Sequence, residues 1–239
     1  MAEKMNLNNL KAQRDSQPIV ELSIPLEDLC VRFEKLYSGA VDDVLREMCL
    51  PHQALPSTIV PLRDNMVVCG EAFTVKALKD PTMGGELEIR VKLLDELRPG
   101  HVVLWNYNGE DSPANWGGVM TQAAKLRGCR GAIIDGGIRD TKDILDQEFP
   151  IWYRYRTSRG ALSHTKIVGY QVPVYVGNVL VYPGDIVLAD IDGALVIPRS
   201  IAVEVLERAE QIEKNEGEIK EWVAAGLSAN DIHNKGGYF

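Results

Sequence analysis

The chain has 239 residues, of which 45% are hydrophobic and 25% are charged, and its formal net charge is -8. These values are typical of a globular protein with a sizeable core, and at this length they favour one large domain. The excess of acidic residues opposes attraction to phosphate backbones, so nucleic acid is not expected as a partner. No apolar segment has the length of a signal-peptide core or a membrane helix, so we expect a cytoplasmic location without membrane contact.

The first part of the chain, residues 1 to about 25, is polar and only weakly periodic. We interpret residues 1–25 as an N-terminal extension that a partner subunit orders, and residues 26–239 as the domain. Between Leu26 and Met48, apolar residues at helical spacing predict two helices with an interruption near Ser38 and Gly39. Ser38 is a candidate N-cap of the second helix.

From Val60 onward, short apolar runs that are typical of strands alternate with helix-like periods. We expect helices at 87–97, 118–126 and around 141–145, and strands at 66–69, 72–77, 102–105, 132–134, 172–176, 179–181, 186–189 and 194–197. This order predicts an α/β fold with a central mixed sheet or small barrel flanked by helices. The segment from Ser200 to Ala225 predicts a long amphipathic helix, whose apolar face we expect to pack across a subunit boundary.

Cysteines and histidines show no metal-binding pattern. The cysteines form no CxxC pair and lie far apart, at Cys30, Cys49, Cys69 and Cys129. We interpret them as reduced thiols of the core. The histidines also lack a ligand grouping, and we expect them to be structural or exposed; they are His52, His101, His164 and His233.

The most informative stretch is 131–140, where an apolar strand meets two glycines, an arginine and an aspartate. Residues 132–134 suit a strand that is buried on both faces. Gly136 and Gly137 permit a sharp turn or a close approach to a ligand. Arg139 can bind a carboxylate in bidentate fashion, and Asp140 can supply an oxygen ligand to Mg²⁺ or Mn²⁺. The alternative is a structural ion pair at the strand end that caps a following helix.

Taken in order, six segments resemble those of the RraA-like family, which includes the 4-hydroxy-4-methyl-2-oxoglutarate and 4-carboxy-4-hydroxy-2-oxoadipate aldolases. The ordered set is more specific than any one segment, and the resemblance covers roughly residues 35 to 235. The segments are SGAVDDVL at 38–45, GEAFTV at 70–75, RPGHVV at 98–103, WGGVM at 116–120, IDGGIRD at 134–140 and YPGDIV at 182–187.

The resemblance implies an α/β fold of the swivelling β/β/α type, assembled as homotrimers or homohexamers with active sites between subunits. It also implies the chemistry of a divalent-metal class II pyruvate aldolase, a lyase, with oxaloacetate decarboxylation as a second activity. In the family aldolases the motif arginine contacts the pyruvyl group and the next aspartate holds Mg²⁺ or Mn²⁺. These roles carry over to Arg139 and Asp140, which are our predicted catalytic residues.

The loop before the helix at 118–126 matches the family segment whose backbone N–H groups receive the substrate carboxylate. We therefore predict substrate binding by Gly117, Gly118, Val119 and Met120 together with Arg139, since the first N–H groups of a helix attract anions. The alternative is a glycine-assisted turn. Family aldolases often carry an acidic residue at the position of Gly118, where it orients metal-bound water, and its absence leaves the proton-handling group unidentified.

Glu216 aligns with a glutamate that family aldolases lend to the metal shell of the neighbouring subunit, so we predict it as a second metal residue. The alternative is a solvated glutamate on a charged helix face. Asp190 and Asp192 flank a turn, and we interpret them as turn formers. Candidates for contacting a second substrate carboxylate are Tyr107, Asn108, Arg154, Arg156 and Arg159, which are equally compatible with an ordinary surface.

Two other functions are weighed against the aldolase. Some members of the family bind the endoribonuclease RNase E and inhibit it without catalysis, and these often lack the complete metal motif. Arg139 and Asp140 favour an enzyme over such a regulator. A methyltransferase is not supported, because no glycine-rich cofactor loop follows a first strand with an acidic ribose-binding residue after it.

Overall fold

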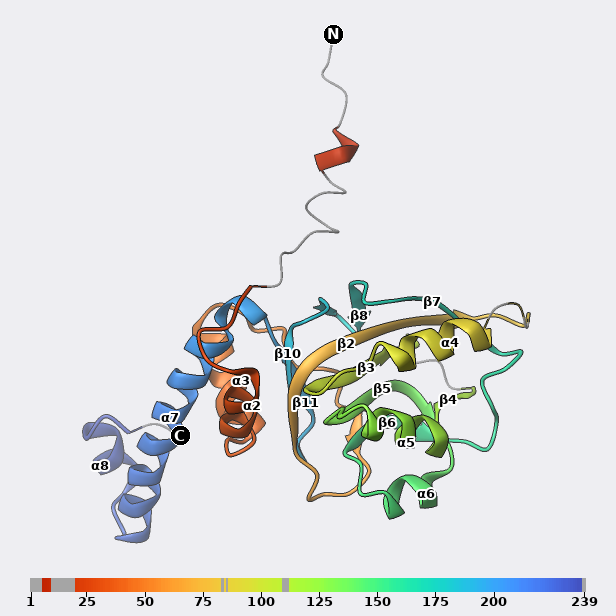
Figure 1. Cartoon of the computed structure of the whole chain (residues 1–239). Coiled ribbons are helices and arrows are strands. Elements are labelled where there is room, and N and C mark those ends of the chain that lie inside the picture. Colours follow the sequence, from red (N-terminus) through yellow and green to blue (C-terminus); the bar gives the residue numbers. More distant parts are fainter. Residues whose placement is uncertain (1–5, 10–19, 83, 85, 109–111, 238–239) are drawn as a thin grey trace.

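The computed structural model describes residues 6–9, 20–82, 84, 86–108 and 112–237. Most of the predicted extension, residues 1–5 and 10–19, lies outside these residues, and the ordering of the extension by a partner stays a prediction. Within the described chain, nine strands form one curling sheet (Figure 1). None of the described helices combines the length and apolar character that a membrane crossing requires.

The centre of the sheet consists of four parallel strands, of which the two middle ones are buried throughout. Strands β2 (Val68–Lys79), β3 (His101–Asn106), β5 (Gly131–Ile138) and β6 (Ile151–Arg156) pair in that order. The helices α4 (Glu86–Asp95), α5 (Gly118–Leu126) and α6 (Thr141–Asp146) connect them. Parallel neighbours need such crossovers, which bring the carboxyl ends of β3 and β5 to one edge.

Antiparallel strands complete the sheet at both sides. β1 (Val60–Pro61) pairs with β6, and β7 (Thr165–Tyr170) and β10 (Ile186–Ala189) both pair with the long strand β2. β11 (Ala194–Ile197) pairs with β10, and the short β4 (Ala114–Trp116) joins β5 in parallel. A separate hairpin joins β8 (Val174–Val176) to β9 (Val179–Val181).

Two groups of helices lie on different parts of the sheet (Figure 1). Helices α4, α5 and α6 form the first group, beside the parallel strands. Helices α2 (Leu26–Phe33), α3 (Ser38–Glu47) and α7 (Ala202–Ala224) pack beside β10 and β11, and the short α8 (Ala229–Asn234) follows α7. The 3-10 turn η1 (Arg199–Ile201) leads into α7. The predicted mixed α/β fold with a long C-terminal helix is therefore confirmed, as are the helices expected from the apolar spacing.

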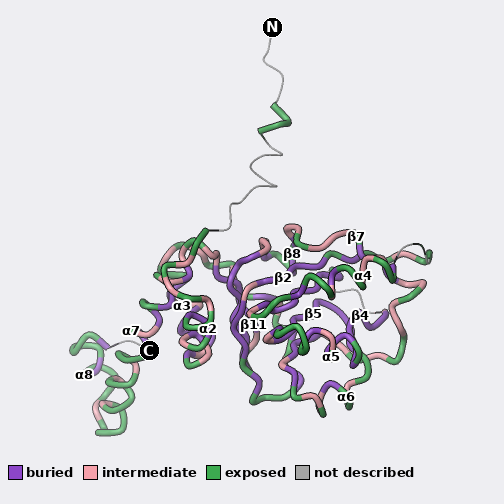
Figure 2. The backbone as a smooth tube through the Cα atoms, in the orientation of Figure 1, coloured by how far each residue is buried: buried purple, intermediate pink, exposed green. Residues whose placement is uncertain are grey.

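Two hydrophobic cores share the β10–β11 hairpin. Figure 2 shows the buried backbone around β11, between the helices α2 and α3 and the other strands of the sheet. Ile186 and Leu188 contact the core of α2, α3 and α7, whereas Val187 and Ala189 contact the main core under the parallel strands. This division follows from the period of two residues with which side chains alternate along a strand. The hairpin is consequently buried on both faces.

The start of α3 corrects one prediction. Ser38 is the first helical residue and not the N-cap, which is Tyr37. The hydroxyl and the backbone N–H of Ser38 both donate to the buried carboxylate of Asp190, at 2.8 and 2.7 Å. Asp190 also accepts the N–H of Asp192 at 2.9 Å. The predicted turn former thus also caps a helix that lies far away in the sequence.

Two glycine positions also differ from expectation. β2 is one strand and not two, because Gly70 continues it: a Cβ there would lie 2.6 Å from the carbonyl oxygen of Gly100. β5 likewise runs through Gly136 and Gly137 without turning. A Cβ on Gly137 would lie 2.8 Å from the carbonyl oxygen of Pro113. These glycines permit close packing within the sheet.

Three of the four cysteines are buried free thiols, as predicted, but Cys49 is exposed. Cys49 follows α3 with a φ of 62°, and this turn holds its side chain at the surface. Burial raises the pKa of the Cys129 thiol to about 12. Burial, followed by the neighbouring Cys30 thiol, also raises the pKa of Cys69. These buried thiols are consequently poor nucleophiles at neutral pH.

The buried carboxyl of Asp185 makes the stability of the fold depend on pH. Burial raises its pKa from 3.8 to about 6, although the N–H groups of Tyr182 and Arg199 donate to it. The folded chain therefore binds this proton more tightly than the unfolded chain, and the contribution to stability decreases as the pH rises from about 4 through about 6.

We expect the wild type to lose about 2 to 3 kcal/mol of stability relative to the Asp185→Asn variant between about pH 4 and pH 7. Urea unfolding of both proteins at the two pH values measures this difference. An identical pH dependence in the two proteins would contradict the assignment.

Candidate functional site

The turn between β5 and α6 holds Arg139 and Asp140 at the carboxyl end of a fully buried strand. Arg139 donates its backbone N–H to the carbonyl oxygen of Trp116 at 3.0 Å, which ties this turn to the end of β4. Asp140 adopts the left-handed conformation, with φ 54° and ψ 35°. Aspartate tolerates this region better than most residues, and such conformations concentrate at functional sites.

The Asp140 carboxylate is directed at the backbone of Gly117 and Gly118. The N–H of Gly118 donates to Asp140 Oδ2 at 3.3 Å. A Cβ on Gly117 would lie 2.6 Å from the same oxygen, so a side chain at position 117 would displace the carboxylate. The Arg139 Nε lies 3.5 Å from Asp140 Oδ2, which is the ion pair that the alternative interpretation expects. Both side chains are nevertheless about half exposed, so they remain accessible to a ligand.

Helix α5 begins directly at this turn with Gly117 as its N-cap. The N–H of Thr121 donates to the carbonyl oxygen of Gly117 at 3.0 Å, which closes the first turn of the helix. The N–H of Gly118 is taken by Asp140, and among the described hydrogen bonds none uses the N–H of Val119 or Met120. These two N–H groups carry the positive end of the helix dipole and suit an anionic group.

One cavity of about 460 Å³ brings most of the predicted residues together. Its wall comes from α4, β4, the start of α5, the β5–α6 turn and residues 160–164. The predicted residues Gly117, Val119, Met120, Arg139 and Asp140 all line it. The predicted metal ligand and the predicted binding residues other than Gly118 therefore share one open cavity.

Asp143 occupies the space that a side chain at position 118 would need. A Cβ on Gly118 would lie 2.8 Å from the Asp143 Cγ, and closer still to its Oδ2. The Gln147 amide donates to Asp143 Oδ1 and to the carbonyl oxygen of Gly118, both at 3.2 Å, and so holds this arrangement. The Asp143 carboxylate of α6 thus leaves no room for a side chain at position 118.

The predicted contacts for a second carboxylate lie elsewhere, with one partial exception. Arg154 donates to the buried Asp135, and Arg159 donates to Ser112 at 2.9 Å. Arg156 lines a neighbouring hollow of about 490 Å³. Residues 156–158 form one wall of this hollow, and Arg139 and Asp140 belong to the other lining segment, 138–141. Tyr107 and Asn108 line neither space.

Two residues of the cavity were not predicted as functional. Arg90 from α4 lines it, and so does His164, which was expected to be structural or exposed. His164 Nδ1 lies 3.0 Å from the carbonyl oxygen of Leu162. Because a carbonyl oxygen only accepts, this contact requires the hydrogen on Nδ1, and in that tautomer Nε2 is the nitrogen that can accept a proton. Sequence spacing alone gives no signal for this placement.

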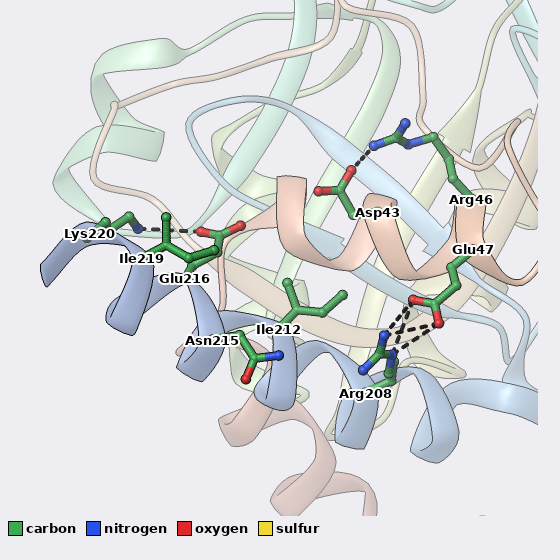
Figure 3. A pocket seen from close by; sticks show the side chains of 9 residues that line it. All are labelled: Asp43, Arg46, Glu47, Arg208, Ile212, Asn215, Glu216, Ile219 and Lys220. Atoms are coloured by element: carbon green, nitrogen blue, oxygen red, sulfur yellow. Dashed lines mark hydrogen bonds and ion pairs between the residues drawn. The ribbon is translucent and has the colours of Figure 1, made fainter. Parts of the chain in front are cut away.

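Glu216 lies away from this cavity within one chain. It stands on α7 beside a cavity of about 530 Å³ between α3 and α7 (Figure 3). It accepts the Tyr37 hydroxyl and lies 3.5 Å from Lys220 Nζ. Figure 1 places α7 and the β5–α6 turn on opposite sides of the molecule. A contribution of Glu216 to the Asp140 site therefore requires a second copy of the chain and stays a prediction.

The comparison with known proteins identifies the family of this chain. A family model described as Aldolase/RraA matches residues 38–196, and this range includes every residue that lines the cavity. The chain belongs to the RraA-like family. A protein of Halalkalibacterium halodurans named "Putative 4-hydroxy-4-methyl-2-oxoglutarate aldolase" is 32% identical over 184 residues, which is 77% of this chain and 83% of that protein.

Solved structures of the RraA-like family share the fold. Streptomyces coelicolor RraAS2, described as an unusual member of the RNase ES inhibitor RraA family, has a TM-score of 0.72 at 27% identity, with 81% of this chain and 97% of that chain covered. A structure described under novel cellulases from microbes associated with the gut ecosystem has a TM-score of 0.86 at 47% identity, covering 90% and 96%. These descriptions apply to those proteins.

The packing of Asp143 against Gly118 yields a stability test. We expect Gly118→Asp to destabilise the fold by roughly 1 to 3 kcal/mol, because the new side chain would overlap the Asp143 carboxylate. Gly118→Asp combined with Asp143→Ala should recover most of this loss. Urea unfolding of both variants and of Asp143→Ala measures the coupling, and a Gly118→Asp variant as stable as the wild type would contradict it.

Proposed function

We propose that this RraA-like protein is a divalent-metal-dependent class II pyruvate aldolase. It cleaves a 4-hydroxy-2-oxo diacid of the 4-hydroxy-4-methyl-2-oxoglutarate type to pyruvate, and it decarboxylates oxaloacetate as a second activity. The observation that carries the proposal is the convergence of Arg139, Asp140 and the N-terminus of α5 on one cavity. Membership of a family with named aldolase relatives supports the same conclusion.

The three components match the chemistry of a 2-oxo acid. The free N–H groups at the start of α5 and the Arg139 guanidinium are donors for the C1 carboxylate and the 2-oxo oxygen. Arg139 is held in position because its backbone is bonded to Trp116, and its Nη1 lies beside Gly160, where a Cβ would be only 2.9 Å away. A pre-positioned cation at the 2-oxo oxygen stabilises negative charge that develops there.

Asp140 fits a Mg²⁺ or Mn²⁺ ion as the protein ligand. These ions prefer oxygen donors, and Mg²⁺ is often bound by one or two carboxylates with water and substrate oxygens. Among the described residues of one chain, no three His, Cys, Asp or Glu side chains come together as a metal site. We therefore propose that the ion is held by Asp140 and that Glu216 of a second copy supplies a further oxygen donor. When bound, the ion supplies Lewis-acid polarisation of the 2-oxo group.

The cleavage itself requires a proton acceptor. Removal of the proton from the 4-hydroxyl breaks the C3–C4 bond, releases a carbonyl fragment and leaves its electron pair on pyruvate enolate, which is then protonated at C3. Loss of CO₂ from oxaloacetate gives the same enolate without a base at a hydroxyl. We assign the acceptor to His164, because its Nδ1 is bonded to Leu162 and Nε2 remains for the substrate.

A second subunit would complete the site. Large apolar side chains at the cavity are exposed, namely Leu87 at 60%, Val119 at 79% and Leu162 at 41%. The C-terminal half of α7 likewise has no buried residue after Ile212. Such apolar exposure around the cavity supports a homotrimer or homohexamer with sites between subunits.

Two other functions are less well supported by the geometry. Two-carboxylate glycoside hydrolysis requires a pair of carboxyl groups flanking the bond, and Asp140 is the sole carboxylate among the described residues that line the cavity. An RNase E inhibitor acts through protein contacts, so that function does not explain the residues that meet at the cavity. Release of reducing sugar from cellulose, or retention of RNase E on the immobilised protein, would favour these functions over the aldolase.

We expect pyruvate release from 4-hydroxy-4-methyl-2-oxoglutarate and from oxaloacetate in the presence of Mg²⁺, and none with a chelator. Arg139→Ala should lower kcat/KM for both substrates by about 10²- to 10³-fold, because charge on the 2-oxo oxygen is no longer stabilised. Asp140→Asn should also weaken Mg²⁺ binding in calorimetry. Arg127→Ala, an exposed arginine of the α5 C-cap paired with Asp95, is the matched control. Full activity of Arg139→Ala would refute the assignment.

His164→Asn separates the two activities. Asparagine keeps an N–H donor for the Leu162 carbonyl but cannot accept the 4-hydroxyl proton. We expect aldol cleavage to fall by about 10²- to 10⁴-fold and oxaloacetate decarboxylation to change little. His52→Asn, at an exposed position, serves as the control. Equal losses in both reactions would assign His164 a structural role instead.

A further inference from the structure

Arg90 is a second arginine of the cavity and belongs to neither the Arg139–Asp140 pair nor the α5 N-terminus. It extends from α4, and its side chain is 14% exposed. Its Nη1 lies 3.2 Å from the carbonyl oxygen of Asn115 and 2.9 Å from the Met120 sulfur. Its guanidinium also lies over the buried Trp105 ring at 5.2 Å. Four elements therefore meet around this one cation.

A buried carboxylate fixes Arg90 in place. Arg90 Nη2 donates to Glu86 Oε1 at 2.5 Å, and Glu86 is only 2% exposed. The other oxygen of Glu86 accepts the N–H of Ile167 from β7 at 2.8 Å. The Glu86 carboxylate is thus held by bonds to both α4 and β7, and it restrains the position of the Arg90 guanidinium. This anchoring pre-positions the guanidinium and reduces the entropy that ligand binding costs.

The guanidinium keeps binding capacity beyond these contacts. It has five N–H donors, and the described bonds of Arg90 involve Nη1 and Nη2 but not Nε. Glu86 balances its charge, so Arg90 contributes directed donors more than long-range attraction. The charged side chains that line the cavity are then Arg90, Arg139 and Asp140. Two arginines from separate elements suit a ligand with two carboxylates.

We propose that Arg90 binds the distal carboxylate of the substrate, so that the cavity selects 2-oxo diacids over 2-oxo monoacids. This inference rests on the proposed function, in which Arg139 and α5 hold the pyruvyl end. It assigns the specificity to a residue of α4 and not to Arg154, Arg156 or Arg159. Arg90 is then a specificity-determining residue, and the breaking bond does not depend on it.

The test uses two ligands of equal chain length, 2-oxoglutarate and 2-oxopentanoate, which differ in the distal carboxylate. Calorimetry in the presence of Mg²⁺ gives Kd for the full-length wild type and its variants. We expect the wild type to prefer the diacid by about 10- to 100-fold, the range that charge-assisted hydrogen bonds provide. Arg90→Lys should reduce this preference, because a point charge does not reproduce the fork.

Removing Arg90 alone leaves Glu86 buried without its partner, so a double variant is needed. Arg90→Gln with Glu86→Gln keeps two groups that can hydrogen-bond and removes both charges. We expect it to bind 2-oxopentanoate as the wild type does and to lose the diacid preference. Its thermal unfolding checks that the fold is retained. Arg156→Gln, in the adjacent hollow, is the matched control and should keep the preference.

The outcomes distinguish this inference from the proposed function. A diacid preference that survives in the double variant, or that is lost in Arg156→Gln, would overturn the role of Arg90. Equal weakening of both ligands would place Arg90 at the pyruvyl end and would overturn it as well. A wild type that binds neither ligand and releases no pyruvate would contradict the proposed function itself.

Discussion

The close approach of the Gly117–Gly118 backbone to the Asp140 carboxylate is the constraint on which the site depends. It needs a glycine at 117, because a Cβ would overlap the carboxylate, and it needs Asp140 in a left-handed turn that points back toward α5. It also needs β4 and β5 to end side by side, which their parallel pairing provides. Each of these requirements is local, yet together they join three elements separated in sequence.

This constraint shapes the electrostatics of the cavity. The Asp140 carboxylate accepts the N–H of Gly118, and the N–H groups of Val119 and Met120 stay available for a ligand. The Asp140 carboxylate and the positive end of α5 therefore lie side by side at the cavity. An ion beside Asp140 and an anion beside α5 can be held together in this way.

Much of the fold follows from apolar spacing. The bounds of α5 agree with the expected 118–126, because a run of helical spacing is bounded there by glycines. Where prediction failed, the cause was an interaction between distant segments. The Ser38 hydroxyl does not cap α3, because it donates to Asp190, and the carboxylate of this distant residue accepts the Ser38 N–H at the start of the helix. Gly70 does not break β2 because it permits contact with Gly100. The local sequence pattern around Ser38 or Gly70 does not reveal that Asp190 or Gly100 lies beside it.

The same limit applies to the site. Arg139 and Asp140 were identified because they follow a buried strand directly, and the structure places them at the cavity. His164 and Arg90 reach the cavity through the pairing of β7 and the packing of α4, which single-sequence patterns do not reveal. Glu86 and Arg90 are four residues apart, a spacing that lets opposite charges pair on a helix, but the burial of this pair depends on how α4 packs.

The shared β10–β11 hairpin has a consequence for how the molecule unfolds. Its residues alternate between the two cores, so a register slip of a single residue would exchange every side chain between the cores and disturb the packing of both at once. Neither core can loosen at this hairpin without disturbing the other. The helices α2, α3 and α7 are therefore tied to the parallel strands as one cooperative unit, and the chain should lose its structure in a single all-or-none transition.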